Sequence, residues 1–387
     1  MPAEVTRGFP DGFGEDPDER RAALVLATLR GITPRRLHEL AWREGSAAGC
    51  LDAIRAGRAG SPGDRDAALV AEPDGIEAAV RAAGCRFVTA ANPGYPSSLL
   101  DLEGDPPVGL FVRGRELTEL VEAVSVVGAR NCSALGNEIA HDIGAGLAGA
   151  GVCVISGAAR GIDAASHRGA LAAGGNTIAV LGSGVDVPYP RGSRQLIERA
   201  ARDGAVVSEY APGVEAEPFR FPARNRIVAA LGRALVVVEG AKGSGSMISV
   251  DHALDLGREV FAVPGPVTSP LSEVPLELIR DGATMIRGAD DLLTDLGFAG
   301  RTTVPAPDHL PEDERRVFEV LVGPCLPDAV ARATGMSIPD AVAALIHLEL
   351  RGLVRGVGGR YERRLPSPEI PFGEPRQVRA LAPLPGR

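Results

Sequence analysis

Six short runs rich in β-branched residues lie in the middle of the chain, separated by longer amphipathic segments. Each run ends in a glycine or a polar turn, and near-continuous apolar runs of this length are typical of strands buried in a parallel sheet. This alternation predicts an α/β fold with an extended, Rossmann-like, doubly wound and mostly parallel sheet. The runs are residues 125–128, 152–156, 177–182, 205–208, 235–239 and 260–264.

The segment between the first two runs predicts a helix that covers the sheet. Its apolar residues recur every fourth position, which places them in one stripe. These residues are Leu135, Ile139, Ile143 and Leu147.

The pattern also predicts two further units and three connecting or terminal segments. We expect a disordered N-terminus (1–16), a small helical domain of the SAM or helix-hairpin-helix kind (17–84), the Rossmann-like domain (85–299), a proline-containing linker (300–311), a winged-helix domain (312–364) and a flexible proline-rich tail (365–387).

Charge restricts the kinds of ligand site that the chain can hold. The 387 residues carry a net charge of −9, and Lys242 is the only lysine, so the positive charge is almost wholly arginine. A site for a polyanion must therefore be a local patch. Arginine suits phosphate because its planar fork donates two hydrogen bonds at once, but a high arginine content also arises from genome composition alone.

Neither a membrane segment nor a metal or redox cofactor is expected. No stretch approaches the roughly 20 apolar residues that cross a bilayer, which predicts a soluble cytoplasmic protein. The five cysteines are odd in number and far apart, and the six histidines are scattered. No spacing typical of zinc or disulfide chemistry occurs.

The loops after the predicted strands contain the candidate binding residues, because ligands of open parallel sheets lie beyond the carboxyl ends of the strands. Glycine permits close backbone approach and arginine supplies a charged fork for phosphate oxygens. The alternative is that these glycines only allow tight turns. The first loop offers Gly128 and Arg130, and the second offers Ser156, Gly157 and Arg160.

Two later segments add aromatic, basic and hydroxyl groups. Residues 219–226 combine two phenylalanines with three arginines, which is typical of proteins that stack bases and contact phosphates without sequence preference. We expect one phenylalanine, Phe221, to be exposed for stacking; the alternative is a helix start whose phenylalanines enter the core. Candidate residues here are Phe221, Arg224, Asn225 and Arg226, followed by Lys242, Gly243 and Ser244 at an expected helix start.

No catalytic set is expected from the sequence. Asp163 precedes a predicted helix and is interpreted as its N-cap, while His167 lies along the helix. Glu239 is available as a base, but no histidine or cysteine is placed to act with it.

Taken in order, these loops resemble the DprA/Smf family of DNA-processing proteins. The similar stretches lie between residues 124 and 265, and an entry segment precedes them (NPGYPSSLLDLEGDPPVGLFVRG). They read VSVVGAR, VISGAARGIDAASHRGAL, TIAVLGSGVDVPYP, SEYAPG, FPARNRIVAALGRALVVVEGAKGSGSMIS and GREVFAVPG.

The resemblance implies a protein that binds single-stranded DNA without sequence specificity, commonly as a homodimer, and helps to load RecA recombinase during natural transformation. It implies neither nucleotide hydrolysis nor a cofactor. All twelve candidate residues named above match motifs of the family and are expected to line a basic pocket at the carboxyl edge of the sheet.

Two segments depart from the family pattern. Residues 249–252 (SVDH) replace a more basic sequence, and residues 272–277 (SEVPLE) replace a glycine- and asparagine-containing loop. We therefore expect a less basic pocket edge and a loop that binds nothing. In the winged-helix unit, residues 337–347 offer few base-reading groups, which favours protein contact or weak DNA contact.

Two other functions remain as alternatives. A Rossmann-type phosphoribohydrolase or nucleotide-binding enzyme is expected to contain a Pro-Gly-Gly-x-Gly-Thr loop, which this sequence lacks. A transcriptional regulator acting through the winged helix requires a helix rich in base-reading side chains.

Overall fold

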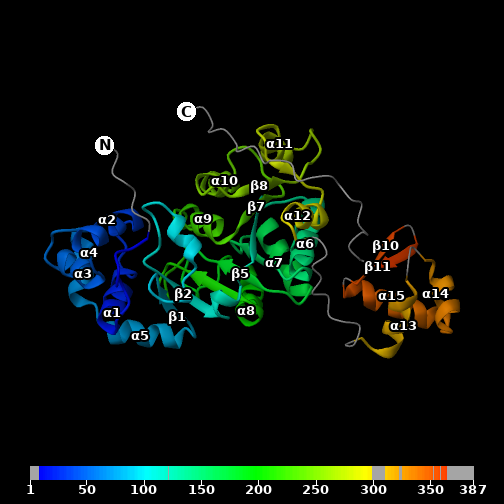
Figure 1. Ribbon diagram of the computed structural model, residues 1–387, viewed down its shortest axis with the longest axis horizontal. Coiled ribbons are helices and arrows are strands. Elements are labelled where there is room, and N and C mark those ends of the chain that lie inside the picture. The colour runs from blue at the N-terminus through cyan, green and yellow to red at the C-terminus, as the bar shows by residue number, and fades with distance from the viewer. Residues whose placement is uncertain are drawn as a thin grey trace.

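The computed structural model describes residues 8–120, 122–298, 310–321, 325–351, 353–357 and 359–363. It contains an N-terminal group of helices, a sheet domain and a small C-terminal unit (Figure 1). Most of the expected linker and the whole expected tail lie outside the described residues.

Within the described residues, the sheet has nine strands in the order β1-β2-β6-β5-β4-β3-β7-β8-β9. All pairings from β6 to β9 are parallel, whereas β1 and β2 run antiparallel at one edge. The strands are β1 (Arg86–Thr89), β2 (Gly109–Gly114), β3 (Ala123–Val127), β4 (Cys153–Ser156), β5 (Thr177–Val180), β6 (Ala205–Ser208), β7 (Ala234–Val237), β8 (Glu259–Ala262) and β9 (Thr284–Met285).

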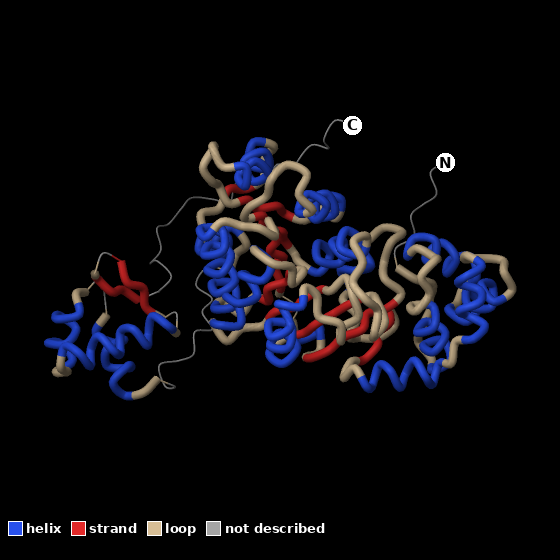
Figure 2. Tube along the Cα trace, turned by 180° about the vertical axis from the view of Figure 1, so that it is seen from behind, coloured by secondary structure: helices blue, strands red, loops and turns tan. Residues whose placement is uncertain are grey.

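Helices cover both faces of the sheet, which confirms the doubly wound prediction (Figure 2). Side chains of a strand alternate between faces, so Val124 and Val126 pack under one helix layer while Val127 packs under the other. One layer contains α6 (Ala134–Gly149), α7 (Ile162–Ala172), α8 (Arg194–Asp203) and α12 (Ala289–Asp295). The other contains α9 (Arg220–Leu231), α10 (Ser246–Asp255) and α11 (Glu273–Arg280).

Two details of the sheet domain differ from the sequence prediction. The six expected strands are all present, but β1, β2 and β9 were not expected. Leu135, expected in the apolar stripe that covers the sheet, is 56% exposed. It lies in the first turn of α6, whereas Ile143 and Leu147, further along the helix, are buried against the sheet.

The N-terminal helices begin at sites that favour helix starts. Proline is the first residue of four of the five, where its missing N–H costs nothing. Asp16, Thr33 and Ser61 cap three of them with side-chain oxygens. The helices are α1 (Pro17–Leu26), α2 (Pro34–Glu44), α3 (Ala47–Arg55), α4 (Pro62–Val70) and α5 (Pro73–Ala82).

The expectation of disorder at residues 1–16 is wrong for the described part of that segment, residues 8–16. Phe13 is 1% exposed and stacks on Phe9 with ring centroids 4.7 Å apart. The carbonyl of Gly8 accepts a hydrogen bond from the indole of Trp42 at 3.0 Å. Aromatic burial therefore anchors this segment despite its polar and glycine-rich composition.

The C-terminal unit has the order of elements of a winged helix, as expected. It consists of α13 (Glu312–Val320), α14 (Pro327–Thr334), α15 (Ile338–Leu350), β10 (Val354–Val357) and β11 (Arg360–Arg363). In the described part of the chain, no single helix has the length and apolar composition needed to span a membrane. Among the described helices, only α14 and α15 taken together reach that length and composition, and they are bent by 109° relative to each other.

Candidate nucleic-acid interface

Three strands and one helix bring the candidate residues to the same edge of the sheet. The chain leaves β3 in one direction toward β6 and then returns to β7 on the other side of β3, so the topological switch point lies between β3 and β7. Helix α9 contacts β3, β4 and β5. Its Asn225 side chain donates to the carbonyl of Gly245 at 3.1 Å, which ties α9 to the loop after β7.

The glycines of the first two loops are required for close packing. A Cβ on Gly128 would lie 2.7 Å from the carbonyl oxygen of Glu239, which follows β7. The same oxygen accepts a hydrogen bond from the Ala129 amide at 2.7 Å, so the two loops approach closely here. Gly161 has a φ of +79°, and a Cβ there would collide with the carbonyl of Ala129. The tight-turn interpretation therefore accounts for Gly128.

Three exposed cations at this edge have side chains that form no ion pair in the part of the chain that the structure describes. Arg130 follows β3, Arg160 follows β4 and Lys242 follows β7. Some other surface arginines of this acidic chain pair with a carboxylate, such as Arg113 with Glu198 at 2.6 Å. The three cations at this edge form no such pair with the described residues and leave local positive potential.

Aromatic rings form a surface beside Arg130. Phe221 is half-buried, and the Arg130 guanidinium carbon lies 5.2 Å from its ring centroid. Tyr189, from the loop after β5, lies 5.1 Å from Phe221 and is 48% exposed. Phe219 is more exposed than Phe221, at 63%, so the expectation of a single exposed ring at Phe221 is incomplete.

Tyr189 and Phe219 add two aromatic rings to this surface that were not among the expected binding residues. Tyr189 stands between two prolines, in a chain where only 4% of residues are aromatic. An aromatic residue in a loop after a strand is the signal that identifies it.

Arg224 is buried at the base of the same edge. It is 3% exposed, packs against Gly157, where a Cβ would collide with its guanidinium, and donates to the carbonyl of Val180. Its Nε has no hydrogen-bond partner among the described atoms. Burial lowers the pKa of Arg224 to about 10, the charge of Asp163 raises it, and that of Arg130 lowers it further. A buried cation with an unused donor is suited to a nearby anion.

Arg226 has a different role from the one expected. It is 3% exposed, and its guanidinium donates to both carboxylate oxygens of Glu209, at 2.7 and 2.9 Å, and pairs with Asp105 at 3.0 Å. Burial lowers its pKa, but these carboxylates raise it above the ordinary value overall. The donors that Arg226 was expected to offer to DNA are therefore used inside the fold.

Ser156 is also occupied by the fold. Its hydroxyl donates to the carbonyl of Val126 at 2.6 Å, joining β4 to β3. In the loop after β7, Gly243 is exposed with a φ of +76°, and the hydroxyls of Ser244 and Ser246 lie 2.5 Å apart. This loop opens α10, whose start has no side-chain cap.

The potential acid and base groups near this edge are hydrogen-bonded to other residues of the fold. The Glu239 carboxylate accepts from the amide and hydroxyl of Ser133, at 2.8 and 2.6 Å. His167 is fully buried beside the Thr177 hydroxyl at 2.6 Å; burial, with a smaller effect of the Arg224 charge, lowers its pKa to about 3.

The N-cap interpretation of Asp163 is wrong. The N-cap of α7 is Gly161, and Asp163 lies within the first turn, where its carboxylate accepts from the amide of Ala159 at 3.3 Å. Burial raises its pKa, although the charge of Arg224 acts in the opposite direction.

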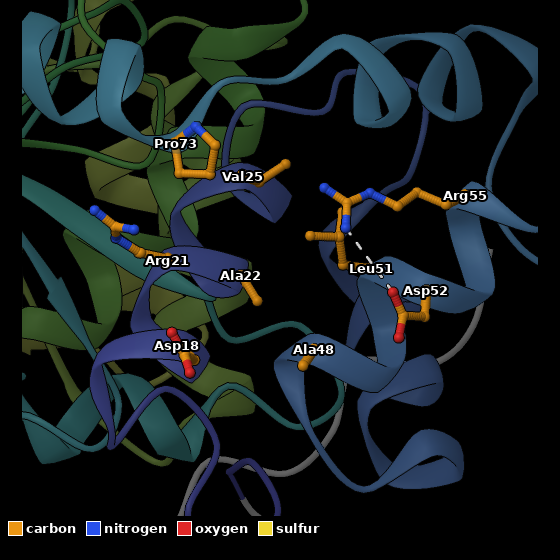
Figure 3. Close-up of a pocket in the computed structure, with 9 residues that line it drawn as sticks. All are labelled: Asp18, Arg21, Ala22, Val25, Ala48, Leu51, Asp52, Arg55 and Pro73. Atoms are coloured by element: carbon orange, nitrogen blue, oxygen red, sulfur yellow. Dashed lines mark ion pairs between the residues drawn. The ribbon is translucent and has the colours of Figure 1, made fainter.

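A cavity of about 250 Å³ in the N-terminal helices does not belong to this edge (Figure 3). Its lining residues come from α1, α3 and the start of α5. Arg55 lies 3.9 Å from Asp52, and Arg21 pairs with Asp74 and with Glu77. Its arginines are therefore already neutralised, unlike Arg130 and Arg160.

Known proteins resemble the chain over most of its length. The family model of DNA recombination-mediator protein A matches residues 86–297, and that of the DprA winged helix domain matches residues 301–360. A putative DNA processing protein DprA of Mycobacterium tuberculosis is 41% identical over 268 residues, which cover 67% of this chain and 69% of that protein.

Solved structures show the same relationship. The crystal structure of DNA processing protein A from Streptococcus pneumoniae matches with a TM-score of 0.62 and 30% identity, covering 72% of this chain and 98% of that one. A DNA processing protein A from Helicobacter pylori, described for its single-stranded DNA binding mode, matches with a TM-score of 0.50 and 26% identity, covering 55% and 97%.

Proposed function

Because the chain belongs to the DprA/Smf family of DNA-processing proteins, we propose that it binds single-stranded DNA without sequence preference at the carboxyl edge of its sheet. The single-strand binding described for the Helicobacter pylori relative supports this choice of ligand. The observation that carries the proposal is the group of exposed cations, Arg130, Arg160 and Lys242, which have no ion-pair partner among the described residues.

In this proposal the twelve candidate residues divide by role. Arg130, Arg160 and Lys242 contact phosphates, Gly243 and Ser244 offer backbone and hydroxyl donors, and the buried Arg224 over Gly157 strengthens the field. Phe221 stacks a base, with Tyr189 and Phe219 extending the aromatic surface. Gly128, Ser156, Asn225 and Arg226 hold the loops and helix in place.

We also propose, on the family resemblance, that the protein acts in the cytoplasm, forms a homodimer, hands its strand to RecA recombinase and catalyses no reaction. For the winged-helix unit we propose a role in protein contact rather than in reading DNA bases. Helix α15 exposes Ile346 and Leu350, which are 43% and 79% exposed, where a DNA-reading helix presents polar groups.

A binding titration with single-stranded and blunt duplex DNA at several salt concentrations tests this function. Three or four phosphate contacts predict a slope of log affinity against log salt of about −2 to −3 for single strands. The proposal also predicts much weaker duplex binding and no nucleotide hydrolysis in parallel reactions. Equal affinity for both DNA forms, or binding that does not depend on salt, contradicts it.

A further inference from the structure

The loop after β7 is held against the start of α11 by backbone hydrogen bonds. The Gly240 amide donates to the carbonyl of Leu271 at 2.7 Å, and the Val274 amide donates to the carbonyl of Gly240 at 3.0 Å. Glu273 lies between these contacts, and its carboxylate accepts a hydrogen bond from the backbone amide of Lys242 at 3.3 Å. An acidic side chain therefore occupies a donor of the loop that we propose for phosphate.

The groups around this amide are those of an anion site. The hydroxyls of Ser244 and Ser246 form one hydrogen bond with each other, so one of their two hydrogens remains available to another acceptor. Both hydroxyls converge on Gly240, within 3.2 Å of the position that its Cβ would take. Lys242, two residues before Ser244, has an exposed side chain, and the amides at the start of α10 have no side-chain cap.

We propose that Glu273 is an internal competitor for DNA phosphate, which holds one anion position of the groove and thereby sets a lower affinity for single strands. This inference rests on the proposed function. A bound strand must displace the carboxylate from the Lys242 amide or leave that position unused. Glu273 is exposed, so it can leave without exposing any of the core.

The segment that contains Glu273 is the one whose sequence departs from the family pattern, residues 272–277. The structure therefore gives this departure a physical consequence. From Glu273 onward these residues form the start of α11 rather than the expected loop, and the Glu273 carboxylate brings a negative charge to the edge of the groove. Because affinity differences between closely related complexes lie mainly in the dissociation rate, Glu273 favours faster release of the strand.

The test compares Glu273→Gln with a matched control, Glu277→Gln. Glu277 lies one turn further along α11 and is also exposed, so both variants remove one negative charge from one helix. Removing a charge next to a phosphate is expected to tighten single-strand binding by about 3- to 10-fold at low salt. Glu273→Gln should show this gain, a slower dissociation rate and a salt slope steeper by up to about 0.7, whereas Glu277→Gln should change affinity by less than about 2-fold.

A double variant separates local competition from general charge. If Glu273 competes for the donors of this loop, its gain should shrink when Ser244→Ala removes one of them; a general effect of net charge leaves the gain unchanged. Equal affinities of Glu273→Gln and Glu277→Gln, or an undiminished gain in the Ser244→Ala background, overturn the inference. Failure of the unmodified protein to bind single strands contradicts the proposed function instead.

Discussion

Replacement of Phe221 by alanine separates a stacking role from a structural one. The ring is half-buried between the Arg130 guanidinium, 5.2 Å away, and Tyr189, 5.1 Å away, and its Cδ1 lies 3.2 Å from the position that a Cβ on Gly182 would take. Part of the ring is therefore packed, and the rest remains accessible to solvent.

The expected magnitudes follow from that half-burial. Truncating a fully buried phenylalanine costs about 3–5 kcal/mol, so a half-buried ring is expected to contribute about 1–2 kcal/mol to the free energy of unfolding. Loss of a stacked base costs about 1–3 kcal/mol of binding, or roughly 5- to 150-fold in single-strand affinity. Phe221→Ala should thus show a modest stability loss together with a clear loss of affinity per folded molecule.

The assay is denaturant unfolding beside a single-strand titration at fixed salt, with Phe219→Ala as the control for stability alone. Phe219 is 63% exposed in the same segment, so its removal should change stability by less than about 0.5 kcal/mol. The stacking argument fails if Phe221→Ala destabilises the protein strongly yet leaves the affinity of the folded fraction at its original value.

Three further predictions concern the packing beneath the interface. Arg226→Gln should lower the free energy of unfolding, measured with denaturant, by about 3–5 kcal/mol, because it leaves the Glu209 carboxylate buried without its partner. The single-strand affinity per folded molecule should change little. A loss of binding free energy as large as the loss of stability contradicts the structural role. His167 stays neutral in the fold because its pKa is lowered from 6.5 to about 3, so the unfolded chain binds the extra proton and stability should fall as pH drops below 6.5. A His167→Gln variant should show a shallower fall between pH 6.5 and about 5 in thermal melts, and an unchanged slope refutes this assignment. Gly161→Ala should lower the free energy of unfolding by more than about 3 kcal/mol, because strain at a φ of +79° adds to a collision with the Ala129 carbonyl. The control is Gly174→Ala, which has a φ of +73° but open space around it and should cost only about 1 kcal/mol. Equal costs of the two variants in unfolding experiments contradict the packing argument.

The central strands could be predicted because their apolar runs are bounded by turns, whereas the outer strands lack that signal. β9 has only two residues, and β2 follows a proline-rich segment that indicates an extended connection. The buried Phe13 shows the limit of composition as evidence. Its neighbours predict disorder, but burial of the ring depends on helices far along the chain.

The candidate interface was predictable at the level of loops and much less at the level of side chains. Arg224 and Arg226 stand two residues apart in one basic run, yet both are buried. The carboxylates that engage Arg226 come from Asp105 and Glu209, which lie in other segments of the chain, so local sequence carries no sign of the pairing. Arginine count alone therefore overstates the charge that DNA can meet.

The most direct test of the interface is the single-strand affinity of an Arg130→Ala, Arg160→Ala double variant across a range of salt. The control is an Arg20→Ala, Arg36→Ala double variant, because these exposed arginines lie in the N-terminal helices and their removal changes the net charge equally. We predict a loss of about 10- to 100-fold in affinity and a salt slope shallower by about 1.4 for the first variant, with little change for the control. Equal affinities of the two double variants, both folded, contradict the account.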